Sequence, residues 1–410
     1  MVYAFRTAVV TSEAWLTAVS ATAPGRRRRR LVPCCITATL VAAALFAVSA
    51  EGSRAVERTP TSPVFAGVPG ALPPGFRYRY NDSFTGWPVR PVSVQHPVRG
   101  SFLDPRGSDN DGLSGYHFGI DVNVDDRRPE RGAPPGLSHR VYALESGVMG
   151  EAVRDTARRC GDRRLDVGHF AYWHTSPIVS EGQYVRAGQQ IGWTCLGEWH
   201  VHVSEWQRYR GVRVWVNPLH RRGKLQPYVD TVAPVVSEFR FQTPPTSPWN
   251  PTVDLRQPDS SRQLQPTSLH GLVEVRARAG DPQSFAGFLA SHPSWVTLDH
   301  PYSLSIEIRN ARTGWLVLRR TSFQSDQLPQ TPYLIHYAPG TSQNLSLSEC
   351  VGLPSAADCR GVYWFRPLSR FRQEFWDTRS VRNGRYTVVV RASDISGNVG
   401  ARRQTVVVAN

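Results

Sequence analysis

The chain has 410 residues, enough for two or three domains with cores of their own. Hydrophobic residues make up 40% and charged residues 20%, which is typical of a globular protein and unlike a disordered chain. The 48 basic residues outnumber the 33 acidic ones and give a formal net charge of +15. Such a charge suits nucleic acid, anionic membrane or a polyanionic envelope. No recognisable nucleic-acid module accompanies it, so we expect no nucleic-acid partner.

The N-terminus carries the features of an export signal. A basic run, Arg26–Arg30, precedes an uncharged apolar stretch at 31–50 that ends in the small residues Val48-Ser49-Ala50. This order predicts a signal peptide at residues 1–50, cleaved before Glu51. The apolar stretch of roughly 20 residues is also long enough to cross a bilayer as an uncleaved anchor, which would make the membrane a partner. Under both alternatives the remaining chain is secreted or lies in the cell envelope, in the periplasm or cell wall.

Four cysteines remain outside the predicted signal. An even number in an exported protein favours two disulfides. The pairing that keeps each bond within one domain is Cys160–Cys195 and Cys350–Cys359.

Short β-like runs begin after a Pro/Gly-rich segment. Residues 51–91 predict an extended linker because proline and glycine are frequent there. From residue 92 to 228 the chain alternates short apolar runs with Gly, Pro and Asp, and no run has a helical period over ten or more residues. Among the expected strands are Phe170–His174, Gln190–Trp193 and His200–Ser204. This domain is therefore predicted to be mainly β.

A second domain is expected at residues 229–410, after a boundary near Asp230–Pro234. Three of its segments alternate apolar and polar residues as half-buried strands do: Gly271–Arg276, Tyr302–Ile308 and Tyr386–Arg391. The C-terminal end resembles the last two strands of immunoglobulin-like or fibronectin-like modules, which implies a β-sandwich. Residues 309–378 are predicted to form a long insertion between strands.

The 12 histidines divide into two groups. Most occupy polar, turn-like contexts and are expected on the surface, among them His220, His270, His300 and His336. The others fall in three motifs: His117-Phe118-Gly119-Ile120-Asp121, Tyr172-Trp173-His174 and His200-Val201-His202. In a strand, His200 and His202 would project from one face, about 7 Å apart. Three protein ligands with a fourth position left for water are the composition of a catalytic zinc site.

In this order, the three motifs resemble the lysostaphin-type or LytM-type zinc metallopeptidases, which cut peptide bonds in peptidoglycan. The similarity runs from Tyr116 to His202 and includes Val141–Val148 and the glycine-containing turn Glu181–Gly192. It implies a small antiparallel β domain with the metal in an open groove, and peptidoglycan stem peptides or cross-bridges as the substrate.

Individual roles follow from the same resemblance. His117, Asp121 and His202 match the ligands of one Zn²⁺, whereas His174 and His200 match the two catalytic histidines. His169 competes with His174 for its role, but it lacks the tyrosine found two residues before His174.

The sequence departs from the family pattern in the segment before His200. Residues Trp193–Trp199 are bulkier and shorter than usual, contain Cys195 and lack the usual proline, which places groove shape and substrate preference in question. Two alternatives stay open: a non-enzymatic domain on the same fold that binds wall peptides or regulates a hydrolase, and an exported peptidase that acts on proteins. Nothing in the sequence predicts an oligomeric state.

Overall fold

The computed structural model describes residues 67–105, 115–150, 153–154, 163–246, 259–282, 298–341 and 362–410. The predicted signal at residues 1–50 lies outside these ranges, as do three of the four later cysteines, Cys160, Cys350 and Cys359. Within them, no helix is long and apolar enough to cross a membrane. Strands dominate the described residues, and helix is limited to short 3₁₀ turns, so the prediction of a mainly β chain is confirmed.

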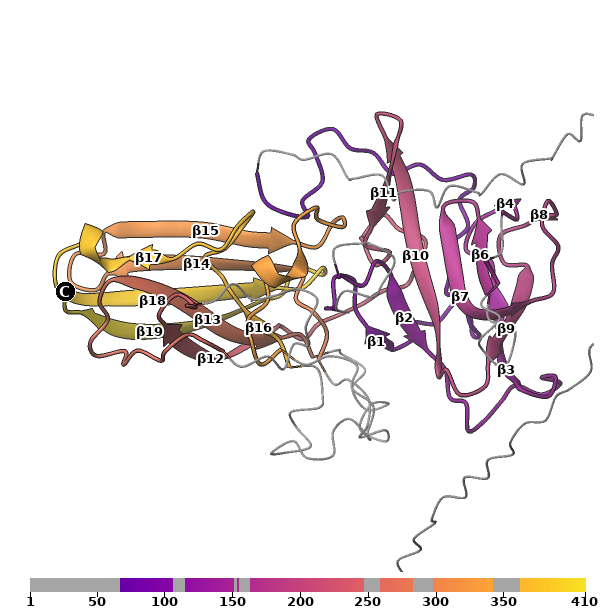
Figure 1. Cartoon of the computed structure of the whole chain (residues 1–410). Helices are drawn as coiled ribbons and strands as arrows, with labels where there is room; N and C mark the ends of the chain where they lie inside the picture. Colours follow the sequence, from indigo (N-terminus) through magenta and orange to yellow (C-terminus); the bar gives the residue numbers. More distant parts are fainter. Residues whose placement is uncertain are drawn as a thin grey trace, which may run out of the picture. The chain divides into compact units, whose positions relative to one another are not determined.

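The first β region is a curled, nine-stranded antiparallel sheet (Figure 1). Its strands are β1 (Val98–Gly100), β2 (Ile120–Asn123), β3 (Leu137–Tyr142), β5 (Val153–Arg154), β6 (Arg163–Val167), β7 (Phe170–Pro177), β9 (Gln190–Cys195), β10 (His200–Tyr209) and β11 (Val212–Val216). The main path runs β1-β2-β10-β7-β6-β5, with β11 beside β10 and with β9 joining β7 to β3. A separate pair consists of β4 (Gly147–Val148) and β8 (Tyr184–Val185).

Strand β10 lies at the centre of this sheet. It pairs with β7 through residues 202–205, with β2 through residues 200–203 and with β11 through residues 205–209. A strand with partners on both sides has its polar backbone satisfied and can be buried on both faces. Val201 and Val203 are fully buried, and the polar residues Ser204 and Glu205 are buried as well. The predicted strand His200–Ser204 is therefore the first half of the central strand.

Residues 67–91, the described part of the segment predicted as a linker, are packed rather than extended into solvent. Trp87 and Val89 are buried, and the indole Nε1 of Trp87 donates to the carbonyl of Pro227 at 2.9 Å. The Tyr80 hydroxyl donates to Glu205 in β10 at 2.7 Å. Proline and glycine content predicted a linker, but a single tryptophan buries enough apolar area to attach such a segment to a domain.

The second β region contains two four-stranded antiparallel sheets (Figure 1). One consists of β12 (Val235–Gln242), β13 (Leu272–Gly280), β16 (Trp364–Phe365) and β17 (Trp376–Asp377), and the other of β15 (Leu316–Gln324), β14 (Ser303–Asn310), β18 (Gly384–Ser393) and β19 (Val399–Val408). Two 3₁₀ turns, η1 (Tyr333–Ile335) and η3 (Thr378–Ser380), lie between strands. Alternate residues such as Ile306 and Val388 are buried in one shared apolar core, as the period-two pattern predicts.

Residues 309–378, predicted as an insertion between strands, instead supply three strands of these sheets. Strand β15 pairs with β14 along its length, and β16 and β17 both pair with β13. The pattern was hard to read because β15 contains Arg319 and Arg320 and buries only Ser322 and Phe323 near its end. An edge strand with one buried end shows little alternation.

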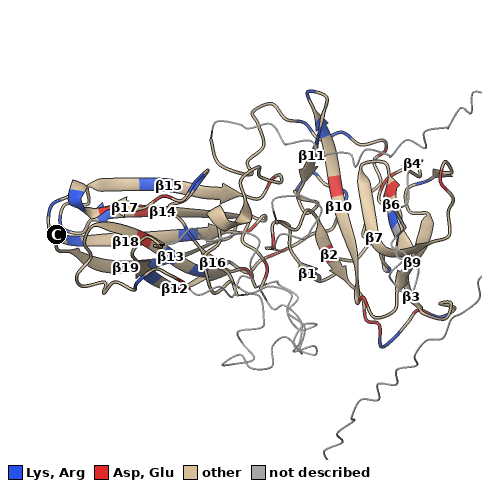
Figure 2. Ribbon diagram, viewed as in Figure 1, with Lys and Arg blue, Asp and Glu red and all other residues tan. Residues whose placement is uncertain are grey.

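The basic residues are spread over both β regions, with acidic residues among them (Figure 2). Several arginines pair with a carboxylate two residues away, because residues i and i+2 of a strand share a face. Examples in the first and second regions are Arg164 with Asp166 at 2.7 Å and Arg240 with Glu238 at 3.0 Å. Part of the positive charge is thus neutralised locally on the strands.

Candidate metal centre

Three predicted ligands meet where β2 and β10 pair. The antiparallel register places Asp121 of β2 opposite His202 of β10. His117 lies four residues before Asp121, in the chain that leads into β2, and its backbone is held by two hydrogen bonds: His117 N to Asp104 O at 2.7 Å and Leu103 N to His117 O at 2.8 Å. Strand pairing and this loop together place the ring of His117 next to Asp121 and His202.

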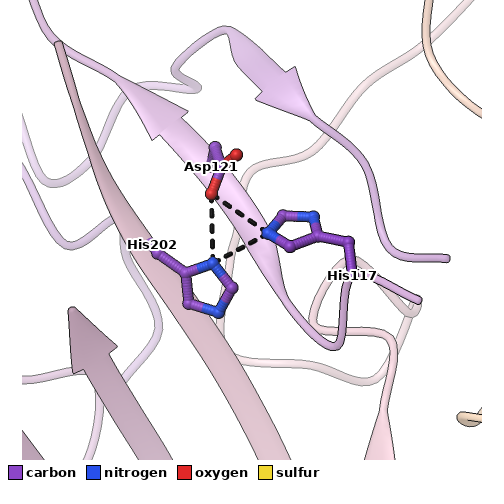
Figure 3. A group of neighbouring side chains, drawn as sticks. All are labelled: His117, Asp121 and His202. Carbon is purple, nitrogen blue, oxygen red and sulfur yellow. Dashed lines mark hydrogen bonds and ion pairs between the residues drawn. The ribbon is translucent and has the colours of Figure 1, made fainter. Parts of the chain in front are cut away.

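The ligand atoms converge on one position (Figure 3). His117 Nε2 and His202 Nδ1 each lie 3.1 Å from Asp121 Oδ1, and the two nitrogens are 2.8 Å apart. All three side chains are buried. Two imidazole nitrogens and a carboxylate oxygen this close together could hold a metal ion.

The opposite ring nitrogens are held by oxygen atoms. His117 Nδ1 lies 2.8 Å from the carbonyl of Ser101, which only accepts, so the Nδ1–H donates and Nε2 keeps its lone pair for a metal. His202 Nε2 lies 2.8 Å from the hydroxyl of Ser204. The Ser101 loop is fixed in turn, because Ser101 N donates to Asp104 Oδ2 at 2.7 Å. Outer contacts of this kind orient metal-binding rings and select their tautomers.

Burial keeps His202 in the form that binds metals. The loss of hydration on burial lowers the pKa of His202 to about 3, although Asp121 acts in the opposite direction. The pKa of His200 is also well below its usual value, again mainly because of burial. Both rings are therefore neutral at neutral pH, and a neutral imidazole is the ligand and proton acceptor that a metal site needs.

Gly119 separates His117 from Asp121 and admits no side chain. A Cβ atom there would lie 2.4 Å from Val203 O and 2.6 Å from His202 Nε2. These distances are far shorter than van der Waals contact, so glycine is required for β2 to approach β10 at this point.

The two predicted catalytic histidines lie together beside the ligands. The rings of His174 and His200 have centroids 4.5 Å apart, and His200 Nε2 lies 3.5 Å from Asp121 Oδ1. Their side chains are 17% and 12% exposed, more than those of the three ligands, so they form the accessible side of the site. His174 Nδ1 lies 3.6 Å from Glu198 Oε2, and His200 Nδ1 faces the Glu198 carbonyl at 2.5 Å.

Backbone conformations in this part of the site are unusual. His174 has φ +60° within β7, and Trp199, which directly precedes His200, has φ +61°. Residues with side chains rarely adopt positive φ, and such strained positions concentrate at functional sites.

His169 lies outside this group. Its Nδ1 is 2.9 Å from Glu145 Oε2, its backbone N–H donates to the same oxygen at 2.7 Å, and its ring packs 4.8 Å from that of Trp206. It precedes the first residue of β7, whereas His174 lies five residues further along the chain beside His200. Of the two competing histidines, the structure places His174 at the site.

The atypical segment before His200 is held in place at several points. Cys195, at the end of β9, is disulfide-bonded; Cys160, its predicted partner, lies outside the described residues. Asp126 Oδ2 accepts from the backbone N–H of Gly197 at 2.7 Å and of Trp199 at 2.8 Å. The guanidinium of Arg140 lies 4.5 Å from the ring centroid of Trp193. These contacts hold the turn in which Trp199 has a positive φ, and so fix the position of His200 at the start of β10.

Sequence reasoning missed the residues that orient the ligands. Ser204 could have been found, because it lies two residues after His202 and so on the same strand face. Ser101 and Asp126 had no such signal, since each reaches the site through a contact distant in sequence. Asp104 acts through its neighbour Ser101.

Comparisons of the chain with family models, with curated proteins and with solved structures gave no match.

Proposed function

We propose that this chain is an exported zinc metalloendopeptidase that hydrolyses peptide bonds in peptidoglycan stem peptides or cross-bridges. The observation that supports the proposal most directly is the convergence of His117 Nε2, His202 Nδ1 and Asp121 Oδ1 within 4.8 Å. Two neutral imidazoles and one carboxylate are a donor set that zinc takes in hydrolases, with a fourth position left open. Nitrogen-rich donors of this kind favour zinc over calcium or magnesium.

The residues beside the ligands suit amide hydrolysis. A bound zinc ion supplies a Lewis acid and lowers the pKa of a bound water toward neutrality. His200 is neutral and directs Nε2 toward the Asp121 carboxylate, so in this proposal it accepts a proton from the attacking water. His174, on the accessible side, would stabilise the negative charge that develops on the carbonyl oxygen or protonate the leaving amine.

The substrate class rests on the sequence. The predicted export signal and the similarity from Tyr116 to His202 favour wall peptides, while the bulky Trp193–Trp199 segment leaves the individual bond undefined. The carboxylate of Glu198, 28% exposed beside His174, gives this segment an acidic group at the site. A substrate with a free amine near the scissile bond would complement it.

The test is product analysis on purified cell wall. The zinc-loaded chain is incubated with intact peptidoglycan and with soluble cross-linked fragments, and new amino termini are identified by mass spectrometry. We expect cleavage of one class of amide bond, lost on chelation and restored by one equivalent of zinc. Stoichiometric zinc with fragment binding and no cleavage would favour the binding or regulatory alternative. Cleavage of unfolded proteins with wall fragments left intact would favour a protein peptidase, and absence of bound metal would refute the proposal.

A further inference from the structure

A second group of buried acidic side chains lies at one end of the second β region. Asp230 precedes β12, Asp281 directly follows β13, Asp299 precedes β14 and Asp394 directly follows β18. Because β12 pairs antiparallel with β13, and β14 with β18, the start of one strand lies beside the end of its partner. The four aspartates therefore gather from four separate stretches of sequence at the same end of the two sheets.

The side chains are close and buried. Carboxylate oxygens of Asp230, Asp281 and Asp394 lie within 4.8 Å of one another, and all three residues are buried. Asp299 is joined to Asp281 by two backbone hydrogen bonds, Asp281 N to Asp299 O at 2.9 Å and Asp299 N to Asp281 O at 2.8 Å. Buried carboxylates at such distances repel one another unless something neutralises them.

Two of these carboxylates have an unsatisfied oxygen. Within the described part of the chain, the Oδ1 atoms of Asp281 and Asp299 are buried and have no hydrogen-bond partner. Asp281 is 6% exposed and Asp299 7%, and both line a small cavity together with Tyr228. An ionised oxygen buried without a partner is costly, so these two atoms point to a ligand in or beside the cavity.

Among the described residues, the charged groups that act on Asp281 are all acidic. Burial raises the pKa of Asp281 most, and repulsion from Asp299, Asp230 and Asp394 adds to it, to give a pKa of about 9. The segment 283–297, which joins Asp281 to Asp299 outside the described ranges, contains no lysine or arginine.

Asp394 is oriented by its own loop. Its Oδ1 accepts from Gly397 N at 2.6 Å and Asn398 N at 2.8 Å, and its Oδ2 accepts from Asn398 Nδ2 at 2.6 Å. The same amide nitrogen donates to the Asp230 carbonyl at 3.0 Å. Oδ1 uses both of its lone pairs in these bonds, whereas Oδ2 keeps one, so the loop positions Asp394 and leaves Oδ2 able to bind a cation.

We propose that Asp230, Asp281 and Asp394 bind one calcium ion, with Asp299 as an additional oxygen donor. Calcium binds oxygen at about 2.3–2.6 Å, so oxygens around one ion lie no more than about 5 Å apart, and the oxygens of this cluster, all within 4.8 Å of one another, meet that condition. Magnesium requires shorter bonds and strict octahedral geometry. A donor set made only of carboxylates also separates this site from the imidazole-rich group at His117, because hard oxygen donors select calcium or magnesium over zinc.

The position of the site suggests its effect. Asp230 belongs to the segment that precedes β12, whereas Asp281 and Asp394 end β13 and β18. A shared ion would join this entering segment to both sheets and remove the repulsion among the carboxylates. Calcium should therefore stabilise the folded chain.

The test uses the full chain, first freed of divalent ions on a chelating resin and then given one equivalent of zinc. Thermal unfolding is followed during titration with CaCl₂, with MgCl₂ and NaCl at matched ionic strength in parallel. We expect CaCl₂ to raise the Tm by about 5 °C or more, half-maximally at about 10⁻⁴–10⁻³ M, the range of extracellular calcium modules. Equilibrium dialysis of the unaltered chain should find one bound calcium.

Variants locate the ion. Asp281→Asn keeps the side-chain shape, removes one repelling charge and should abolish the calcium-dependent Tm shift without lowering the calcium-free Tm. Glu238→Gln, which neutralises a half-exposed carboxylate on β12, should keep the full shift. Asp121→Ala should also keep it, because the zinc group is separate. A CaCl₂ response no larger than that of NaCl, no bound calcium in dialysis, or an unchanged shift in Asp281→Asn would each overturn the proposal and indicate carboxyls that share protons instead.

Discussion

The Nε2 atom of His117 and the Nδ1 atom of His202 face each other at 2.8 Å, and each ring is held at its other nitrogen by an oxygen atom. The two rings thus use different nitrogens toward the same position. Without a metal, the one proton of neutral His202 can lie on Nδ1 and bridge this gap. With a metal at Nδ1, that proton would lie on Nε2 and face the hydroxyl of Ser204. The two rings are therefore preorganised for a cation, which would lower the free-energy cost of ordering the site on binding.

Asp121 should be essential for metal binding. Asp121→Asn keeps the shape of the side chain but removes the anionic ligand, leaving two neutral imidazoles. We expect zinc content to fall from about one equivalent to a small fraction, because charge loss weakens binding of a divalent ion. Metal analysis after dialysis measures this. Asp377→Asn, at an exposed carboxylate paired with Arg379, is the control; full zinc occupancy in Asp121→Asn would show that the carboxylate is misassigned.

His174 and His200 should be needed for catalysis and not for metal binding. Replacing either by Ala leaves the three ligands in place, so zinc should stay bound while hydrolysis falls by about 10²–10⁴-fold. His169→Ala should be nearly silent on turnover, because Glu145 and Trp206 hold that ring elsewhere. Zinc stoichiometry and turnover are measured on one soluble wall peptide for all three variants.

Two results would reverse these assignments. Loss of zinc in His200→Ala would show that His200 is a ligand. This is the strongest alternative, because His200 Nε2 lies 3.5 Å from Asp121 Oδ1. An inactive His169→Ala beside an active His174→Ala would exchange the roles of those two histidines.

Gly119→Ala should disturb the metal centre through packing alone. The added Cβ would meet Val203 O and His202 Nε2, so β2 and β10 must separate or the imidazole must turn. We expect a loss of about 1–3 kcal/mol in the free energy of unfolding together with weaker zinc binding. Gly67→Ala, where the added atom meets nothing within 4 Å, is the matched control. Urea unfolding and zinc titration of both variants would detect the difference, and equal values would refute the crowding argument.

His300 should make the chain less stable in mild acid. Burial lowers its pKa to about 3, and its ring lies among aromatic side chains including Phe323 and Phe365. In the unfolded chain its pKa is about 6.5. Between these values the unfolded state binds a proton that the folded state does not, so stability falls as the pH falls, by about 1.4 kcal/mol per pH unit.

A substitution isolates this contribution. Between pH 7.5 and pH 5, the free energy of unfolding of His300→Leu should fall by about 2 kcal/mol less than that of the unaltered chain, as measured by urea unfolding. His270→Leu, at an exposed histidine, should follow the unaltered chain. The same loss in all three proteins would mean that His300 is protonated in the folded state.

Much of the fold was predictable from local patterns. The period-two alternation identified Tyr302–Ile308 and Tyr386–Arg391. The second lies within β18, and the first, except for Tyr302 itself, lies within β14. His200 and His202 fall on the central strand for the same reason. The alternation failed for Leu316–Gln324, because a strand that buries only one end has little pattern to read.

The sequence by itself determined the residue types at the candidate metal centre and their order. The resemblance of its three motifs to a zinc peptidase family implied His117, Asp121 and His202 as ligands, and the strand period placed His200 and His202 on one face. Only the tertiary structure decided which neighbours complete the centre. Strand pairing places Asp121 opposite His202, His174 and not His169 lies beside His200, and the carbonyl of Ser101 contacts the ring of His117 from a loop.

The burial of polar side chains and the aspartate cluster were likewise decided by the tertiary structure and not by local sequence. His220, His300 and His336 were expected on the surface and are buried, so that prediction is wrong. Asp230, Asp281 and Asp394 carried no local signal at all. Whether a polar side chain is buried, and what it meets there, depends on strands paired across long stretches of sequence, and no local period encodes that pairing.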